Sequence, residues 1–222
     1  MTSVSTAQLS RMNDIQLICF DLDKTLIDQS SWYKLNLALG ITHEQDQAMV
    51  DAYLRNEFNY VEWTKKILQF YKKSDKANRT DMRAILSDYQ FVPGAVETVT
   101  YLQAKGYKVA LISGSVDMMV NLAASDLNVD FAEACNTLVF DEAGRLTDLI
   151  PCVSDISAKL DYLQNICDRL GIDITQCACV GDGDNDVALS DATGHGITFT
   201  DSHIKDNAWK VITALPELKE LF

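Results

Sequence analysis

The sequence lacks an excess of positive charge, and it lacks any long apolar run. Its 19 lysine and arginine residues stand against 32 aspartate and glutamate residues, a formal net charge of −13 over 222 residues. This balance opposes unaided binding to nucleic acid or to an anionic membrane, so neither is expected as a partner. No apolar segment approaches the ~20 residues of a membrane span. The first sixteen residues, Met1–Gln16, are polar and carry no secretory signal, so a cytoplasmic protein is expected.

Cysteine and histidine are present but lack the spacing of a zinc site. The six cysteines are scattered and several fall on apolar runs, as is typical of reduced core thiols. Cys177 and Cys179 would lie on one face of a strand, as a metal pair could, but no second pair follows at zinc-type spacing. Buried thiols are therefore the favoured interpretation. The three histidines form no cluster, and none is assigned a role.

Apolar residues make up 47% of the chain, enough for one large core or for a core with an inserted second unit. Short apolar runs alternate with amphipathic helical segments, and this alternation predicts an α/β fold, a Rossmann-like three-layer core around a parallel sheet. A hairpin is expected around residues 141–144, and a closing helix over 215–221. The expected strands are 15–20, 107–112, 176–180, 196–199 and 210–212.

The segment between the first two expected strands is helical throughout. Ser30 or Ser31 can cap a helix that ends at Gly40, and three further apolar stripes with i, i+3/i+4 spacing follow. Such a segment is long enough to form a small bundle, with its aromatic residues in the bundle core. We therefore expect a core made of residues 1–27 and 91–222, with residues 28–90 as a helical insertion.

The first apolar run delivers two carboxylates, Asp21 and Asp23, to the end of a strand. In open α/β sheets, ligands bind beyond the carboxyl ends of the strands. Two carboxylates this close repel each other unless a cation or a shared proton intervenes, so the pair indicates a divalent metal, a nucleophile, or both. The alternative is a turn in which one aspartate only caps the residues that follow.

Polar residues also follow two later strands: Ser113-Gly114-Ser115 after 107–112, and Gly181-Asp182-Gly183-Asp184-Asn185-Asp186 after 176–180. One site could collect all of these groups. Three more carboxylates would repel without a cation among them, and ligands that are all oxygen suit Mg²⁺ rather than zinc. The Ser113 hydroxyl and the Gly114 N–H can hold a phosphate oxygen, although such a tripeptide is also typical of a turn.

Lys159 is expected in the first turn of its helix, where the helix dipole disfavours a cation. A lysine that simply reaches water would explain this position. Beside the acidic cluster, Lys159 can instead pair with Asp182 or Asp186 and neutralise a transferring phosphate.

Taken in order, these motifs resemble the haloacid dehalogenase superfamily of phosphatases. The sequence DLDKT at Asp21–Thr25 matches the first motif, Ser113 the second, Lys159 the third, and GDGDND at Gly181–Asp186 the fourth. The match in order and spacing covers nearly the whole chain and is more specific than any single motif. The helical insertion over residues 28–90 resembles the family's cap. The fourth motif and GYKVALISGS at Gly106–Ser115 are most similar to the phosphoserine phosphatase branch.

The resemblance implies a Mg²⁺-dependent phosphomonoesterase acting on a small soluble phosphorylated metabolite, as a monomer or a homodimer. Asp21 would form an aspartyl-phosphate, and Asp23 would protonate the leaving alcohol and then activate water. The Mg²⁺ ligands would be Asp21, Asp182 and the backbone carbonyl of Asp23, supported by Asn185 and Asp186. The phosphate would be bound by Thr25, Ser113, Gly114 and Lys159. A phosphotransferase or mutase, or a regulator phosphorylated on Asp21, are the alternative functions.

Two departures from this branch concern the substrate. In the branch, a glutamate about nine residues beyond the nucleophile holds the substrate amino group, and Ser30 stands there in this chain. The branch's cap arginine, which holds the substrate carboxylate, aligns with Trp63–Ile67, where no arginine occurs. We therefore expect phosphoserine to be a poor substrate, with Asp28 as the nearest carboxylate that could replace the glutamate.

Overall fold

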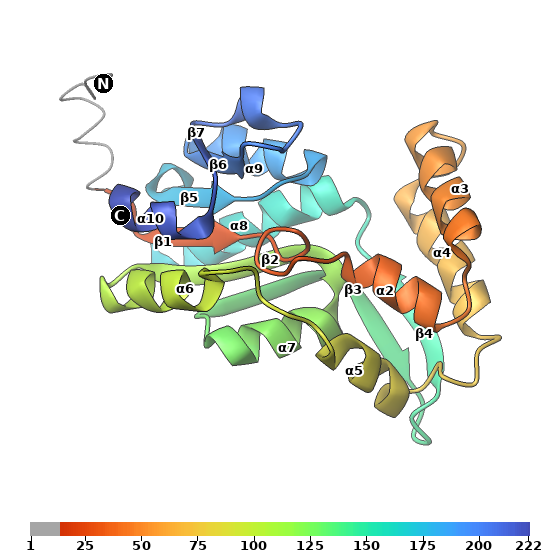
Figure 1. Ribbon diagram of the computed structural model, residues 1–222. Helices are drawn as coiled ribbons and strands as arrows, with labels where there is room; N and C mark the ends of the chain where they lie inside the picture. Colours follow the sequence, from red (N-terminus) through yellow and green to blue (C-terminus); the bar gives the residue numbers. More distant parts are fainter. Residues whose placement is uncertain (1–13) are drawn as a thin grey trace.

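The structure is a computed structural model that describes residues 14–222, so most of the polar segment Met1–Gln16 lies outside the described residues. Its centre is a seven-stranded sheet with the order β4-β3-β2-β1-β5-β6-β7 (Figure 1). All neighbouring strands run parallel except β3 and β4. The strands are β1 (Leu17–Phe20), β2 (Lys108–Val116), β3 (Phe131–Phe140), β4 (Leu146–Pro151), β5 (Cys177–Val180), β6 (Gly196–Phe199) and β7 (Lys210–Ile212).

Helices cover both faces of this sheet. Side chains alternate along β1, so Leu17 and Cys19 face one core while Ile18 and Phe20 face the other. The first core is closed by α8 (Asp155–Leu170) and α9 (Asp184–Thr193). The second is closed by α6 (Ala95–Ala104), α7 (Asp117–Leu127) and α10 (Leu218–Leu221). This arrangement confirms the predicted Rossmann-like three-layer α/β fold (Figure 1).

Four helices separate β1 from α6: α2 (Ser31–Ala38), α3 (His43–Leu54), α4 (Tyr60–Tyr71) and α5 (Arg79–Ser87). Each begins where a short polar side chain accepts a backbone N–H of the first turn, and these N-cap residues are Ser30, Thr42, Asn59 and Asn78. Figure 1 shows α3 and α4 beyond the end of the sheet that carries β4, and α4 packs against β4. The boundary between a core and a cap remains a prediction.

Two elements differ from the sequence-based expectation. The strand expected to end at Ile112 continues to Val116, because β3 pairs with it through a register shift between Ser113 and Val116. Ser113-Gly114-Ser115 therefore lies within β2 and does not form a turn after it. Helix α8 begins at Asp155, which puts Lys159 in its second turn instead of its first.

The remaining expected elements are present. The hairpin forms between β3 and β4, where the Asp141 N–H donates to the Arg145 carbonyl at 2.9 Å. Cys177 and Cys179 are free thiols buried within β5. No helix within residues 14–222 is both long enough and apolar enough to cross a membrane.

Candidate active site

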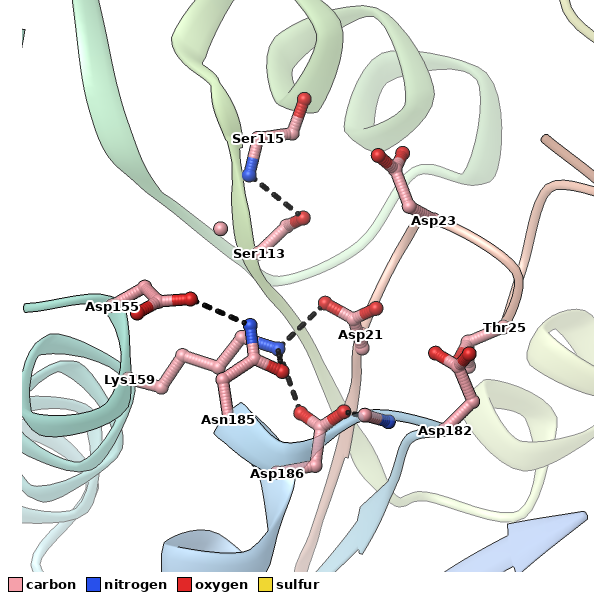
Figure 2. A network of polar contacts seen from close by, with 12 residues as sticks. Asp21, Asp23, Thr25, Ser113, Ser115, Asp155, Lys159, Asp182, Asn185 and Asp186 are labelled. Carbon is pink, nitrogen blue, oxygen red and sulfur yellow. Dashed lines mark hydrogen bonds and ion pairs between the residues drawn. The ribbon is translucent and has the colours of Figure 1, made fainter. Parts of the chain in front are cut away.

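Three neighbouring strands of the sheet bring the predicted site residues together at one edge. Asp21 follows β1, Ser113 lies near the end of β2, and Asp182 follows β5. Because β1 pairs in parallel with both β2 and β5, the carboxyl ends of all three strands meet. Lys159 reaches this edge from α8, and Asp186 from the first turn of α9 (Figure 2).

Lys159 is fully buried at the centre of this cluster. Its Nζ donates to Asp21 Oδ1 at 2.7 Å, to Asp186 Oδ1 at 2.7 Å and to Asn185 Oδ1 at 3.3 Å. Its side-chain exposure is 0%, so the interpretation of Lys159 as a solvated surface lysine is wrong. Its carboxylate partners are Asp21 and Asp186, whereas the sequence had suggested Asp182 or Asp186.

Burial is the main cause of the raised carboxyl pKa values in this cluster, and neighbouring charges modify them. Burial raises the pKa of Asp21 to about 7; Lys159 opposes this and Asp186 adds to it. Burial also raises the pKa of Asp182, with a further contribution from Asp186. Burial alone would lower the pKa of Lys159, but the charges of Asp186 and Asp21 outweigh it and hold that pKa above its ordinary value.

The carboxylates of Asp21, Asp182 and Asp186 fit a divalent cation. One oxygen from each lies within 4.8 Å of the others. Such a set of hard oxygen atoms suits Mg²⁺. Thr25 Oγ1 donates to Asp182 Oδ1 at 3.4 Å and so restrains that carboxylate. The remaining aspartate of Gly181–Asp186, Asp184, is exposed and contacts His203 at 2.8 Å, so the expectation that it joins the cluster is wrong.

Backbone geometry in the fourth motif is arranged around Asp186. A Cβ atom at Gly181 would overlap the Asp186 carboxylate, so only glycine allows this close approach. The Gly183 N–H donates to Asp186 Oδ2 at 3.2 Å while Oδ1 accepts from Lys159. The Asn185 amide is also held at both ends. Its Oδ1 accepts from Lys159 Nζ, and its Nδ2 donates to Asp155 Oδ2 at 3.1 Å.

Asp23 points away from this cluster (Figure 2). It contacts Ser31, the first residue of α2. Its Oδ2 accepts hydrogen bonds from the Ser31 backbone N–H at 2.8 Å and from Ser31 Oγ at 2.7 Å. Its Oδ1 is buried and has no hydrogen-bond partner among the described residues. Burial raises the pKa of Asp23 to about 6, against the lowering effect of the Ser31 hydrogen bonds. The arrangement leaves one fixed carboxyl oxygen free for a ligand.

A cavity of about 200 Å³ lies between Asp21, Asp23 and the helices α2 and α4. Its core side is lined by Ser113, Gly114, Ser115, Asp155 and Asn185, and its helical side by Trp32, Tyr60 and Trp63. Ser30 and Asp28 are not among the residues that line it: Ser30 caps α2, and Asp28 is exposed. Asp28 therefore does not replace the glutamate that holds the substrate amino group in the phosphoserine phosphatase branch.

The sequence analysis missed five residues of this site: Ser31, Trp32, Tyr60, Trp63 and Asp155. Ser31 and Asp155 are the first residues of α2 and α8, where small polar and acidic residues are common for reasons of helix stability alone. For the aromatic residues, the sequence did contain one signal: the spacing of Tyr60 and Trp63 places them on the same face of α4 as its apolar stripe. That stripe indicates packing, however, and does not by itself indicate a pocket.

Comparisons with known proteins show which proteins this chain resembles. A phosphoserine phosphatase of Idiomarina loihiensis is 30% identical over 184 residues, covering 82% of this chain and 81% of that protein. One from Methanocaldococcus jannaschii is 28% identical over 209 residues, covering 93% and 95%. The solved structure of a phospho-aspartyl intermediate analogue of phosphoserine phosphatase has a TM-score of 0.77 at 26% identity and covers 93% of this chain and 98% of that one.

The family model for haloacid dehalogenase-like hydrolases matches residues 15–189, a range that contains every site residue from Asp21 to Asp186. This match spans most of the chain and includes all four motifs. The chain therefore belongs to the haloacid dehalogenase-like hydrolases.

Proposed function

We propose that this chain is a Mg²⁺-dependent phosphatase that hydrolyses a small phosphomonoester through an aspartyl-phosphate on Asp21. The observation that carries the proposal is that two neighbouring carboxylates, Asp21 and Asp23, have different hydrogen-bond partners. Asp21 is held by the buried Lys159, while Asp23 lines the same cavity and has a buried Oδ1 with no hydrogen-bond partner among residues 14–222. A nucleophile and a separate acid facing one cavity suit the cleavage of a phosphate ester.

In the first step, Asp21 attacks phosphorus. Lys159 holds Oδ1, which leaves Oδ2 as the nucleophile. The bond between phosphorus and the ester oxygen breaks, and the departing alcohol takes a proton from Asp23. Ser113, Gly114 and Lys159 would bind the phosphate. Thr25 would hold the Asp182 carboxylate in position through its hydrogen bond to that side chain.

In the second step, the Asp23 carboxylate takes a proton from water as that water attacks phosphorus. Inorganic phosphate leaves, Asp21 is regenerated as a carboxylate, and Asp23 is again protonated. When bound, Mg²⁺ would be held by Asp21, Asp182 and the backbone carbonyl of Asp23, with Asp186 and Asn185 in support, and would neutralise charge on the transferring phosphate. A regulator that only accepts a phosphate on Asp21 has no need of the acid at Asp23.

We also propose that residues 28–90 act as a cap over a core of residues 1–27 and 91–222, of which 1–13 lie outside the described structure. Two contacts support this division. Trp32 Nε1 of α2 and Tyr60 Oη of α4 donate to the Gly114 carbonyl of β2 at 3.0 and 3.3 Å. The helical segment therefore meets the sheet next to Ser113.

The test of the proposed function is phosphate release from a panel of small phosphomonoesters, with Mg²⁺ and after chelation. We expect stoichiometric release of phosphate and alcohol with Mg²⁺ and no added acceptor, and loss of release after chelation. Release that depends on a second alcohol would identify a phosphotransferase. Absence of release from every ester in the presence of Mg²⁺ would contradict the proposal.

Asp23→Asn is expected to lower the steady-state rate by about 10²-fold, the usual scale of general acid–base catalysis. Its effect should depend on the leaving group. p-Nitrophenolate leaves without a proton, so the variant should still give a burst of p-nitrophenol equal to the enzyme concentration, followed by slow turnover. An alkyl ester should give no burst.

Ser31→Ala serves as a graded control for this prediction. It removes one of the two hydrogen bonds to Asp23 Oδ2 and keeps the backbone N–H. We expect the steady-state rate of this variant to fall about tenfold, since a hydrogen bond to a charged group contributes about 1.5–3 kcal/mol.

One outcome would contradict the role of Asp23. If Asp23→Asn lost burst and turnover equally for the alkyl ester and for p-nitrophenyl phosphate, Asp23 would not be the acid.

A further inference from the structure

The part of the cavity that would receive the leaving alcohol is both aromatic and acidic. From this combination we infer that the enzyme prefers phosphomonoesters of N-alkylated amino alcohols, with the quaternary or alkylated ammonium group bound by Trp32, Tyr60, Trp63 and Asp155. The inference rests on the proposed phosphatase function of the same site and names its substrate class.

The three rings form one cluster contributed by two helices. The Trp32 and Trp63 rings have centroids 4.9 Å apart at an interplanar angle of 71°, and Tyr60 stacks on Trp63 at 5.7 Å and 23°. All three line the cavity next to Asp23. Aromatic faces attract a cation whose centre lies within about 6 Å, and tryptophan does so most strongly. Such a cluster suits an alkylated ammonium better than it suits a hydroxylated group.

The polar atoms of two of these rings are already engaged by the protein. Trp32 Nε1 donates to the Gly114 carbonyl at 3.0 Å, and Tyr60 Oη donates to the same carbonyl at 3.3 Å. Asn136 Nδ2 donates to Tyr60 Oη at 2.7 Å and to the Gly114 carbonyl at 2.7 Å. These bonds fix the Trp32 and Tyr60 rings in place, so these two rings offer the ligand aromatic surface and not hydrogen bonds. A quaternary ammonium, which has no N–H to satisfy, matches this surface.

The charges around the cavity point to the same ligand. Its lining contains the carboxylates of Asp21, Asp23 and Asp155, and no lysine or arginine within residues 14–222 lines it. The nearby lysines of α4, Lys65 and Lys66, are exposed. Lys159 and a bound Mg²⁺ would serve Asp21, Asp186 and the phosphate, so a substrate carboxylate would find no lysine or arginine in the lining to pair with. An ammonium group would instead meet Asp155. Because Asp21 and Asp23 act on the phosphate and the leaving oxygen, Asp155 is the carboxylate left for the head group.

The experiment compares four esters with the Mg²⁺-loaded enzyme: phosphocholine, phosphoethanolamine, O-phosphoserine and 3,3-dimethylbutyl phosphate. The last has the shape of phosphocholine without its charge. We expect kcat/KM for phosphocholine to exceed that for the dimethylbutyl ester by at least about tenfold. It should also exceed that for phosphoethanolamine severalfold and that for phosphoserine by about 10²-fold or more.

Variants assign the preference to residues. Trp63→Leu and Asp155→Asn should each reduce the ratio of kcat/KM for phosphocholine to that for the dimethylbutyl ester by severalfold, mainly through KM for phosphocholine. Trp63→Phe, which keeps an aromatic face, should preserve most of the ratio. Asp161→Asn is the matched control, because Asp161 is an exposed residue of the same helix as Asp155. The ratio is measured within each protein, so partial misfolding of a variant does not change it.

Two outcomes would overturn the inference while leaving the proposed function intact. One is phosphate release from the panel with the dimethylbutyl ester as good a substrate as phosphocholine. The other is phosphoserine as the best of the four esters. If none of these esters or p-nitrophenyl phosphate released phosphate, the proposed function would fail first and the inference with it.

Discussion

Asp21→Asn is expected to release no measurable phosphate from any ester while keeping the fold of the wild-type protein. An amide oxygen does not attack phosphorus, and it is a weaker ligand for a divalent cation than a carboxylate. The substitution preserves the volume of the side chain and leaves an oxygen that can still accept from Lys159. Lys159 keeps its second carboxylate partner, Asp186, so no buried charge is left uncompensated and the folded state loses little.

Activity and stability have to be measured together for this variant. We expect a thermal midpoint within a few degrees of wild type, and no acid-stable phosphoryl label on the protein after rapid quenching with a radiolabelled ester. Asp28→Asn is the control, because it makes the same change at an exposed position in the same loop. Turnover by Asp21→Asn comparable to that of Asp28→Asn would remove Asp21 from the proposed mechanism.

The part of this site that depends on strand ends was predictable from the sequence. Asp21 directly follows one short, wholly apolar run, and Asp182 follows another with only Gly181 between. Those runs pair side by side as β1 and β5. Neighbouring parallel strands end at the same edge of a sheet, so the meeting of the two aspartates follows from the pattern. The capped helices from α2 onward were predictable for a similar reason, since caps and apolar stripes are local signals.

The residues that were missed depend on contacts between distant segments. Ser31 contacts Asp23 because the start of α2 folds back over the loop after β1, and Asp155 reaches Asn185 from a helix 30 residues away. Strand β2 runs past Ile112 because β3 is there to pair with it. None of these contacts has a local sequence signature, because each is decided by which surfaces pack together.

Lys159→Met is expected to reduce both stability and turnover. The side chain is fully buried between Asp21 and Asp186, and methionine fills a similar volume without the charge. Removing one partner of a buried ion pair typically costs ~3–5 kcal/mol, because the charge left behind is no longer compensated. Loss of a preorganised positive charge beside a reacting phosphate is expected to lower kcat by up to about 10³-fold.

Lys108→Met is the matched control. Lys108 forms an equally short ion pair with Asp130, at 2.6 Å, but its side chain is 52% exposed. An exposed pair of this kind contributes at most ~1 kcal/mol, so this variant should remain close to wild type in stability and turnover. If Lys159→Met behaves like Lys108→Met in both measurements, Lys159 neither compensates the negative charges of Asp21 and Asp186 nor stabilises the reacting phosphate.

The pH dependence of stability distinguishes a lost charge from lost packing in Lys159→Met. Burial raises the pKa of Asp21 to about 7 even with Lys159 present, and Lys159 opposes that rise, so its removal raises the pKa of Asp21 further. A carboxyl group whose pKa is higher in the folded state stabilises the fold at low pH and loses that contribution as pH rises through the folded-state value. Denaturant unfolding without divalent cations should therefore show a destabilisation that is modest near about pH 6 and grows above about pH 7. A loss of stability that is the same at both pH values would indicate that the variant suffers from altered packing, since packing does not titrate.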